Sequence, residues 1–281
     1  GSLAPTCGPI EGFTQFKVIG SNFVEQGFGL AKCVFNGTYV MNATVIDKTT
    51  MICDSPPLET TNGDMFYNVS VTLDGGDFIS NATGTFSYYK QPTILSVTPN
   101  LGPLEGGTVS NVTGKGFAHK NICDFKARYE QTHLAVTNLT DTSFLVTSPS
   151  ANLSGAVLVS VAGNNQQFIN DLTVHYRDLE NTFEYIQPFL IEAMTPDALS
   201  NSGNSPLRLT SLNFDQFKHD NNTLKNVVLY CRFIKDQDDV VVIGNETKMI
   251  KLSNQDQKCI GPKTDYQGDA KVQLSANGQQ W

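Results

Sequence analysis

The chain of 281 residues is 40% hydrophobic and carries a formal net charge of −8. This composition is typical of globular protein, and the acidic balance without a Lys/Arg cluster excludes nucleic acid as an expected partner, because phosphate binding requires concentrated positive charge. No apolar run approaches the roughly 18 residues of a membrane span, and Gly1-Ser2 resembles a cloning scar. We therefore expect a membrane to be involved only through an anchor that lies outside these residues.

The first element in chain order recurs later in the sequence. Residues 5–12 are echoed at 99–106, and this register continues for eleven further residues, while a weaker third copy follows the second. Three copies of about 95 residues predict three domains, at 1–91, 92–180 and 181–281. Arrays of this kind usually present surfaces to partners or hold them apart, so the repeat favours a binding or structural role over catalysis.

Short alternating runs with turn residues about every ten positions predict strands along the whole chain. The clearest are 68–73, 93–98, 157–161, 172–176, 189–194 and 270–274. On the first of these, Asn68, Ser70 and Thr72 are expected on the polar face. No helix of ten or more residues is predicted, so the expected fold class is all-β, with three immunoglobulin-like sandwiches in tandem.

Two short linkers are predicted, at 88–92 and 176–188. Short linkers with proline favour an extended, semi-rigid rod of the three sandwiches. Trp281 aligns with Phe168, and the second domain continues beyond that position into its last strand. The third domain is therefore expected to lack its final strand in this chain.

Four of the six cysteines have equivalent places in two copies. Cys33 and Cys53 in the first domain correspond to Cys231 and Cys259 in the third, which predicts two disulfides within domains. Each disulfide closes a loop and thereby raises the free energy of unfolding by roughly 3 kcal/mol. Both disulfides fit an oxidising compartment. Zinc is the alternative, but the sequence has no CxxC pair and only four scattered histidines, so no metal is expected.

The other two cysteines are unmatched. Cys123 takes the first cysteine position of the second domain, whose second position is Val146, and Cys7 lies before the first repeated glycine. The turn after the first strand and the loop before the third strand lie at facing poles of consecutive sandwiches, so we hypothesise a disulfide between Cys7 and Cys123 across the first junction. Free thiols, or a Cys7–Cys53 pair, are the alternatives.

Acceptor sequences for N-glycosylation occur nine times, about twice the number that the composition predicts by chance. They are Asn36, Asn42, Asn68, Asn81, Asn111, Asn138, Asn152, Asn221 and Asn245. An Asn/Thr-rich chain makes such sequences freely, but the cysteine pattern supports a secreted protein independently.

No pattern for catalysis or for a cofactor is found, since GxSxG, HExxH and P-loop sequences are missing. Residues 114–117, Gly-Lys-Gly-Phe, open no helix and are interpreted as the turn that leads a phenylalanine into the core. The acidic run at 236–239 is interpreted as a solvated hairpin tip, because the Gly and Glu of a calcium loop do not follow. We expect a protein that is not an enzyme and holds no cofactor.

Two loops are candidates for contact with a partner. The loop around Phe23 contains Phe28 and Leu30, which have no obvious place in the core, and the third domain has a comparable stretch around Phe217. Exposed apolar groups anchor partners, although ordinary core filling is the simpler interpretation of both loops.

The repeated residues resemble the IPT/TIG domain, an immunoglobulin-like domain found in plexins and in some transcription factors. The second copy shows the pattern best, at Pro99, Gly102, Pro103, Gly106, Gly107, Thr108, Gly114, Gly116 and Phe117. The first copy departs from it at Phe13 and Asn22, and the third keeps little beyond Pro196, Gly203 and Phe214. The net charge, glycosylation sequences and disulfides oppose a transcription factor.

Tandem domains of this family with disulfides and glycosylation sequences are similar to the extracellular stalks of plexins and scatter-factor receptors. They also resemble the amoebal Tgr adhesion and allorecognition receptors, which the Asn/Thr-rich, Trp-poor composition favours. This resemblance implies a fragment from the extracellular face of the plasma membrane that binds a protein ectodomain of the same or a related receptor. A passive structural stalk and a noncatalytic β-module of a secreted carbohydrate-active protein are the alternatives.

Overall fold

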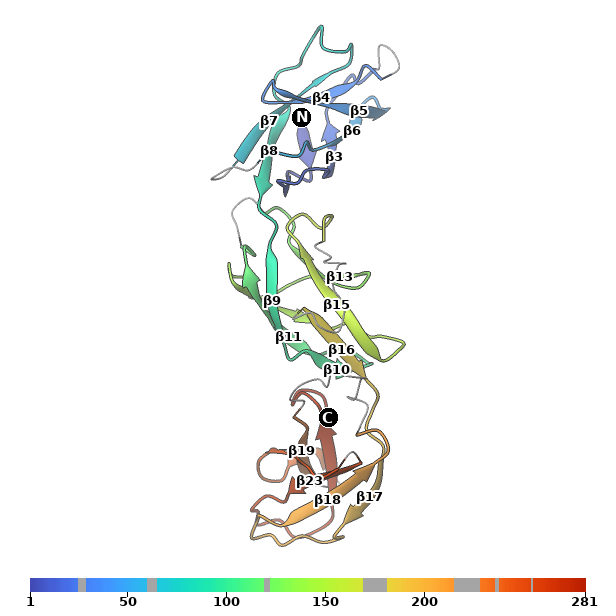
Figure 1. Cartoon of the computed structure of the whole chain (residues 1–281), viewed down its shortest axis with the longest axis vertical. Coiled ribbons are helices and arrows are strands. Elements are labelled where there is room, and N and C mark those ends of the chain that lie inside the picture. Colours follow the sequence, from blue (N-terminus) through green and yellow to red (C-terminus); the bar gives the residue numbers. More distant parts are fainter. Residues whose placement is uncertain are drawn as a thin grey trace. The chain divides into compact units, whose positions relative to one another are not determined.

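The computed structural model describes residues 1–24, 29–59, 65–118, 122–168, 181–214, 228–235, 238–253 and 255–281. Over these residues all regular structure is β-strand, as Figure 1 shows, and there is no helix of the length and apolar character needed to cross a membrane. The predicted all-β class is confirmed.

The chain folds into two compact units. The first unit comprises Gly1–Val97, Asn111–Val146 and Leu158–Val174, and the second comprises Thr98–Ser110, Thr147–Val157 and His175–Trp281. The contacts between the first and second repeats that are described below belong to the first unit. Those between the second and third repeats belong to the second unit.

The first repeat is a sandwich of eight strands in the order β1-β3-β6-β5-β4-β7-β8-β2. Their bounds are β1 Ser2–Ala4, β2 Cys7–Pro9, β3 Gln15–Ile19, β4 Lys32–Phe35, β5 Tyr39–Asp47, β6 Thr50–Asp54, β7 Met65–Thr72 and β8 Gly84–Tyr89. Strand β5 pairs with β4 through residues 39–42 and with β6 through residues 43–47, so it passes from one layer to the other. Strand β8 pairs antiparallel with β7 and parallel with β2.

Strands of the second repeat lie in both units. Their bounds are β9 Thr93–Thr98, β10 Leu101–Pro103, β11 Val109–Lys115, β12 Lys126–Tyr129, β13 Thr132–Leu134, β14 Ser143–Thr147, β15 Gly155–Ala162 and β16 Thr182–Ile186. In the first unit β12 pairs antiparallel with β13 and β15. In the second unit β10 pairs parallel with β16, as β2 does with β8.

The third repeat has two sheets, both within the second unit. Its strands are β17 Ile191–Thr195, β18 Pro206–Ser211, β19 Tyr230–Lys235, β20 Asp238–Val242, β21 Thr247–Lys248, β22 Ile250–Lys251, β23 Asp256–Ile260 and β24 Ala270–Ser275. One sheet has the order β17-β18-β23-β22, and the other has β19 beside β20, β21 and β24. Leu207, Leu209, Phe233 and the Cys231–Cys259 disulfide lie in the core between them.

One prediction about the strands is wrong. The segment predicted as a linker contains β16, whose Phe183 and Tyr185 are buried. Thr72 lies on the predicted face of β7 with Asn68 and Ser70, opposite the core residue Val71, but it is buried there and its hydroxyl donates to Asp74 at 2.7 Å. The strand predicted at 172–176 lies outside the described residues, and the domain limits remain predictions.

The repeated glycine of each copy has a steric reason. Gly12, Gly106 and Gly203 have φ values of 78°, 78° and 83°, in the left-handed region that other residues rarely adopt. A Cβ on Gly106 would also lie 2.6 Å from the carbonyl carbon of Pro149. The chain therefore needs glycine where it turns against the segment that follows β6, β14 or β23.

An ion pair on the third repeat makes its stability depend on pH. Arg208 donates to both carboxylate oxygens of Asp256, at 3.1 and 2.7 Å, and Thr210 and Ser253 donate at 2.8 and 2.9 Å. These contacts, the Arg208 hydrogen bonds first, lower the pKa of Asp256 below its usual value. A depressed native pKa stabilises the fold above the unfolded value of about 4, and this stabilisation is lost as the pH falls further.

We therefore expect the urea midpoint for unfolding of the third repeat to decline as the pH falls from 5 to 3. The fluorescence of Trp281, the only tryptophan, reports this unfolding. Asp256→Asn should lower the midpoint at pH 6 and flatten this decline, whereas Asp265→Asn, at an exposed carboxylate, should leave both unchanged. An equal decline in the wild type and in Asp256→Asn would show that other groups control it.

Candidate functional site

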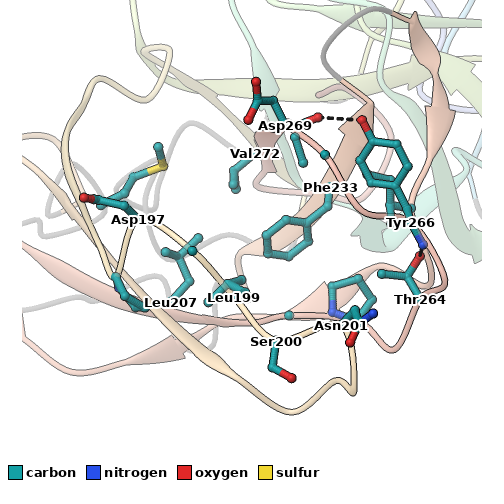
Figure 2. A pocket seen from close by; sticks show the side chains of 18 residues that line it. Asp197, Leu199, Ser200, Asn201, Leu207, Phe233, Thr264, Tyr266, Asp269 and Val272 are labelled. Atoms are coloured by element: carbon teal, nitrogen blue, oxygen red, sulfur yellow. Dashed lines mark hydrogen bonds between the residues drawn. The ribbon is translucent and has the colours of Figure 1, made fainter.

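An open cavity of about 410 Å³ lies in the third repeat (Figure 2). The ring of Phe233 lies between Leu199 and Leu207 on one side and Tyr266 on the other, and the Tyr266 hydroxyl donates to the carbonyl oxygen of Asp269 at 2.9 Å. The cavity is lined mainly by apolar side chains and by backbone. No group of three or more metal-binding side chains is found in the described parts of the chain.

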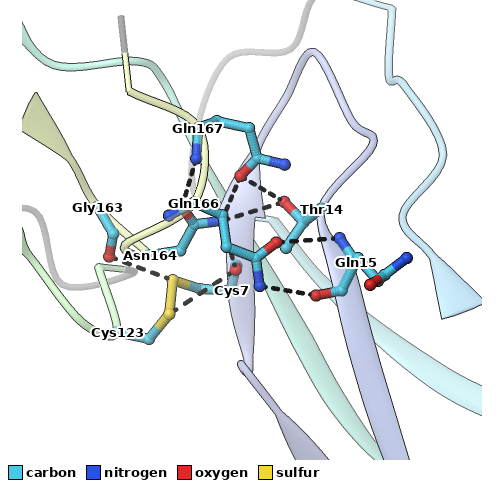
Figure 3. Close-up of a disulfide and its surroundings, with 8 residues drawn as sticks. All are labelled: Cys7, Thr14, Gln15, Cys123, Gly163, Asn164, Gln166 and Gln167. Carbon is cyan, nitrogen blue, oxygen red and sulfur yellow. Dashed lines mark hydrogen bonds between the residues drawn. A yellow bond between two sulfur atoms is a disulfide. The ribbon is translucent and has the colours of Figure 1, made fainter. Parts of the chain in front are cut away.

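Three disulfides are present, and they join the pairs that the sequence analysis proposed. Cys33 of β4 is bonded to Cys53 of β6, and Cys231 of β19 to Cys259 of β23, with Cα–Cα distances of 6.3 and 6.1 Å. Each links the two layers of its own sandwich. The third bond joins Cys7 of the first repeat to Cys123 of the second, with a Cα–Cα distance of 5.7 Å (Figure 3).

Cys123 was predicted at the first cysteine position of the second repeat, but it lies four residues before that position. Strand register shows that Ala127 is equivalent to Cys33, because Ala127 pairs with Val161 as Cys33 pairs with Val71. Cys123 lies in the turn that precedes β12, and its backbone N–H donates to Gly163. This turn position, rather than a strand position, brings its sulfur to the neighbouring repeat.

Beside this disulfide, the loop after β15 binds the first repeat through three amide side chains. We call Asn164, Gln166 and Gln167 the first junction loop (Figure 3). Gln166 pairs with the backbone of Gln15, accepting from its N–H at 3.2 Å and donating to its carbonyl at 2.8 Å. This two-point contact imitates the pairing of a neighbouring strand.

Asn164 lies at the centre of the first junction loop and is 2% exposed. Its amide nitrogen donates to the Cys7 carbonyl at 3.4 Å, to the Thr14 hydroxyl at 3.2 Å and to the Gln167 side chain at 2.6 Å. Thr14 in turn donates to Gln167 at 3.1 Å. The junction is therefore held by uncharged, buried hydrogen bonds in addition to the disulfide.

The loop after β24 repeats this arrangement on the second repeat. We call Asn277, Gln279 and Gln280 the second junction loop. Gln279 accepts from the N–H of Val109 and donates to its carbonyl, both at 2.8 Å. Gln280 donates to the Gly107 carbonyl at 2.7 Å.

Asn277 has the role of Asn164. It donates to the Leu101 carbonyl at 3.0 Å, to the Thr108 hydroxyl at 3.1 Å and to Gln280 at 2.8 Å. Leu101 is equivalent to Cys7 by the repeat offset, so the second junction has the same hydrogen bonds without a disulfide at this position. Neither junction loop was predicted, although Asn-Asn-Gln-Gln-Phe and Asn-Gly-Gln-Gln-Trp stand at equivalent places in the sequence.

The first repeat has an equivalent loop with different chemistry. Asp74 stands three positions after Val71, the strand partner of Cys33. Asn277 likewise stands three positions after Leu274, the strand partner of Cys231. Asp74 folds the loop in the same way, with its carboxylate accepting from the N–H groups of Gly76 and Phe78 at 3.3 and 3.1 Å. The hydroxyl of Thr72 first, and then these backbone groups, lower the pKa of Asp74.

The aromatic residue that closes each loop has a different environment in the first repeat. Phe168 and Trp281 stack on Arg128 and Arg232, whose guanidinium carbons lie 4.3 and 4.4 Å from the ring centroids. The equivalent Phe78 is 73% exposed. Gly76 and Asp77 take the places of the two glutamines, so this loop lacks the amide side chains by which the other two loops bind a preceding repeat.

The exposed apolar side chains beside this loop form the surface that we call the apex surface, defined by Leu30, Phe78 and Ile79. They are 37%, 73% and 47% exposed. Leu30 adjoins the loop, because its carbonyl accepts from Gly75 N–H at 3.0 Å. Of the predicted partner-binding residues, the structure thus places Leu30 here, while Phe28 and Phe217 lie outside the described residues.

Eight of the predicted glycosylation asparagines are described, and all eight are exposed: Asn36, Asn42, Asn68, Asn81, Asn111, Asn138, Asn152 and Asn245. Asn221 lies outside the described residues. None of these sequences falls in the loop of residues 74–80 or at Leu30. Glycan attachment at these eight positions is sterically feasible and remains a prediction.

Comparison with known proteins gives one family. The model of the IPT/TIG domain matches residues 1–88 and 92–176. Plexin-A4 of Danio rerio is 28% identical over 135 residues, which are 46% of this chain and 6% of plexin-A4, so the chain spans a small part of that relative's length.

Solved structures are also similar, and two of them serve as examples. The full extracellular region of plexin A4, domains 1 to 10, matches 99% of this chain and 23% of its own length at 15% identity, with a TM-score of 0.47. The protein SGBP-B of Bacteroides ovatus, in complex with a mixed-linkage heptasaccharide, matches 92% of this chain and 69% of its own length at 11% identity, with a TM-score of 0.29.

Proposed function

Since this chain belongs to the IPT/TIG domain family, we propose that it is the extracellular recognition fragment of a cell-surface adhesion or allorecognition receptor. Its partner is a protein ectodomain of the same or a related receptor, which it meets on the outer face of the plasma membrane. Three disulfides and eight exposed glycosylation sequences support an extracellular place. A protein of the Tgr type fits this description.

The apex surface carries the proposal. Two of three equivalent loops bind a preceding repeat through amide side chains, whereas the third exposes Phe78 and Ile79 instead. An exposed aromatic ring on a loop held by Asp74 offers a partner an ordered apolar anchor. Asp74 and Asp77 flank this anchor with negative charge. A partner pocket whose rim carries positive charge complements them best.

Phe78→Asp should weaken association at least tenfold, because a buried aromatic anchor is replaced by a charge. The measurement is sedimentation of the glycosylated chain over a concentration series, alone and with candidate receptor ectodomains. Phe66→Asp is the matched control, since Phe66 is 53% exposed on β7 of the same repeat. Equal losses in the two variants would contradict a role of the apex surface.

A structural stalk is the second candidate, and the two junction loops favour it. Hydrogen bonds at both junctions, with a disulfide at the first, hold each repeat against the one before it. A chain that stays monomeric at every concentration, and that ignores every ectodomain offered, would support a spacer. The carbohydrate-module alternative gains little from Trp281, whose ring stacks on Arg232.

A further inference from the structure

In the first repeat, the space between β7 and β2 is filled by strand β8. Phe86 of β8 is fully buried, with its ring centroid 5.1 Å from that of Phe16 and 6.1 Å from that of Phe35. Two residues later, the Tyr88 hydroxyl donates to the Pro56 carbonyl at 3.0 Å. Strand β8 is thus held in place by two of its own side chains, an aromatic ring and, two positions later, a tyrosine.

The second repeat uses the same pattern on β16. Phe183 is fully buried, and the Tyr185 hydroxyl donates to the Pro149 carbonyl at 2.7 Å. Between them, the N–H of Glu184 donates to the Asn100 carbonyl, as that of Ser87 donates to Thr6 in the first repeat. Two copies therefore seat the sequence Phe-x-Tyr in equivalent places.

In the third repeat, the corresponding place is the cavity of Figure 2. Strand register makes Leu207 equivalent to Phe16, Phe233 to Phe35, and Pro262 to Pro56. All three line the cavity.

Neither edge of this cavity is joined to a further strand in the described part of the chain. Strand β24 pairs with β19 alone, whereas its equivalent β7 lies between β4 and β8. The segment 198–200, equivalent to β2 and β10, belongs to no strand. A groove of about 410 Å³ thus separates two strand edges at the position where the other repeats hold a strand.

We propose that this groove binds an added β-strand, supplied from outside residues 1–281, with the pattern aromatic–x–Tyr. The strand runs antiparallel to β24 and parallel to residues 198–200. Its aromatic ring packs on Leu207 and Phe233, and its tyrosine hydroxyl donates to the Pro262 carbonyl. The N–H of its middle residue donates to the carbonyl of Asp197, which is equivalent to Thr6 and Asn100.

One residue distinguishes this groove from its equivalents. Leu199 stands where the other repeats have Gly8 and Gly102, and a Cβ on either glycine would lie 3.0 Å from Phe86 or Phe183. The Leu199 side chain therefore narrows the groove beside the aromatic position. Asp197 and Asp269 on its lining favour a strand with a basic residue at its end, as Lys90 follows β8.

The probe is the peptide Gly-Thr-Phe-Ser-Tyr-Tyr-Lys, which has the sequence of residues 84–90. Added to the full chain, it should bind saturably at one site and slow amide hydrogen exchange at least tenfold in β24 and in residues 198–201. A peptide with Ala at its Phe and Phe at its first Tyr should bind at least tenfold more weakly.

A tethered version keeps the proposal testable if the free peptide binds weakly, since a linker raises the effective concentration. The same seven residues follow Trp281 through a flexible Gly/Ser linker, and a scrambled sequence of equal composition is the control. The tethered sequence should raise the melting temperature of the third repeat and protect both edges, and Val272→Arg should abolish both effects. Identical melting and exchange in the tethered and scrambled proteins would overturn the proposal.

Discussion

Cysteines at positions 127 and 146 of the second repeat are expected to form a fourth disulfide and to raise the free energy of unfolding of the first unit by about 3 kcal/mol. Ala127 on β12 is equivalent to Cys33 and Cys231, and Val146 on β14 is equivalent to Cys53 and Cys259. The gain comes mainly from restriction of the unfolded chain, and the closed loop is nearly as long as that of the Cys33–Cys53 disulfide, whose sequence separation is 20.

Packing at these positions favours the change. Ala127 and Val146 are 0% and 1% exposed, so the added sulfurs stay inside the core. Ala127→Cys adds one atom and Val146→Cys removes one, so the core volume is nearly conserved.

The double variant Ala127→Cys/Val146→Cys is compared with the wild type by guanidinium unfolding under oxidising conditions. Mass analysis of unreduced peptides identifies the 127–146 bond. The single variant Ala127→Cys is the control, since it changes the core without closing a loop. Two free thiols in the folded double variant would show that the second repeat does not share the geometry of its neighbours.

The repeat made much of the fold predictable from sequence. Turn glycines and core phenylalanines recur at fixed spacing because each copy needs the same left-handed turn and the same central ring, as Gly106 and Phe117 do. Strand β16 was missed because its neighbourhood is acidic, which is typical of a linker. Thr182-Phe-Glu-Tyr-Ile nevertheless matches Thr85-Phe-Ser-Tyr-Tyr of β8, and this likeness was the available signal.

The junction and apex surfaces were less predictable. Asparagine and glutamine are ordinary surface residues, and only the loop geometry gives Asn164 its three acceptors. The apex surface depends on a difference between copies, because Phe78 aligns with two stacked rings but has Val34 where they have arginine. Such a difference becomes visible only after the strand register is known.

Asn277→Ala is expected to loosen the second junction by about 1 to 3 kcal/mol, since it removes a half-buried donor shared by three acceptors and leaves them partly unsatisfied. Asn164→Ala removes the same contacts at the first junction, but there the Cys7–Cys123 disulfide keeps the two surfaces together. The effect on the first junction should therefore be much smaller while this bond is intact, because a covalent link keeps the effective concentration of the partners high.

Amide hydrogen exchange reads each junction separately, since the N–H groups of Gln15 and Val109 donate to Gln166 and Gln279. Asn277→Ala should speed exchange at Val109 at least tenfold and leave Gln15 unchanged. Asn164→Ala should have a comparable effect on Gln15 only when Cys7 and Cys123 are also replaced by serine. Asn165→Gly is the matched control, because it gives the first loop the glycine that the second has at position 278. Fast exchange at Gln15 in Asn164→Ala with the disulfide present would mean that the hydrogen bonds, and not the covalent bond, hold the first junction closed.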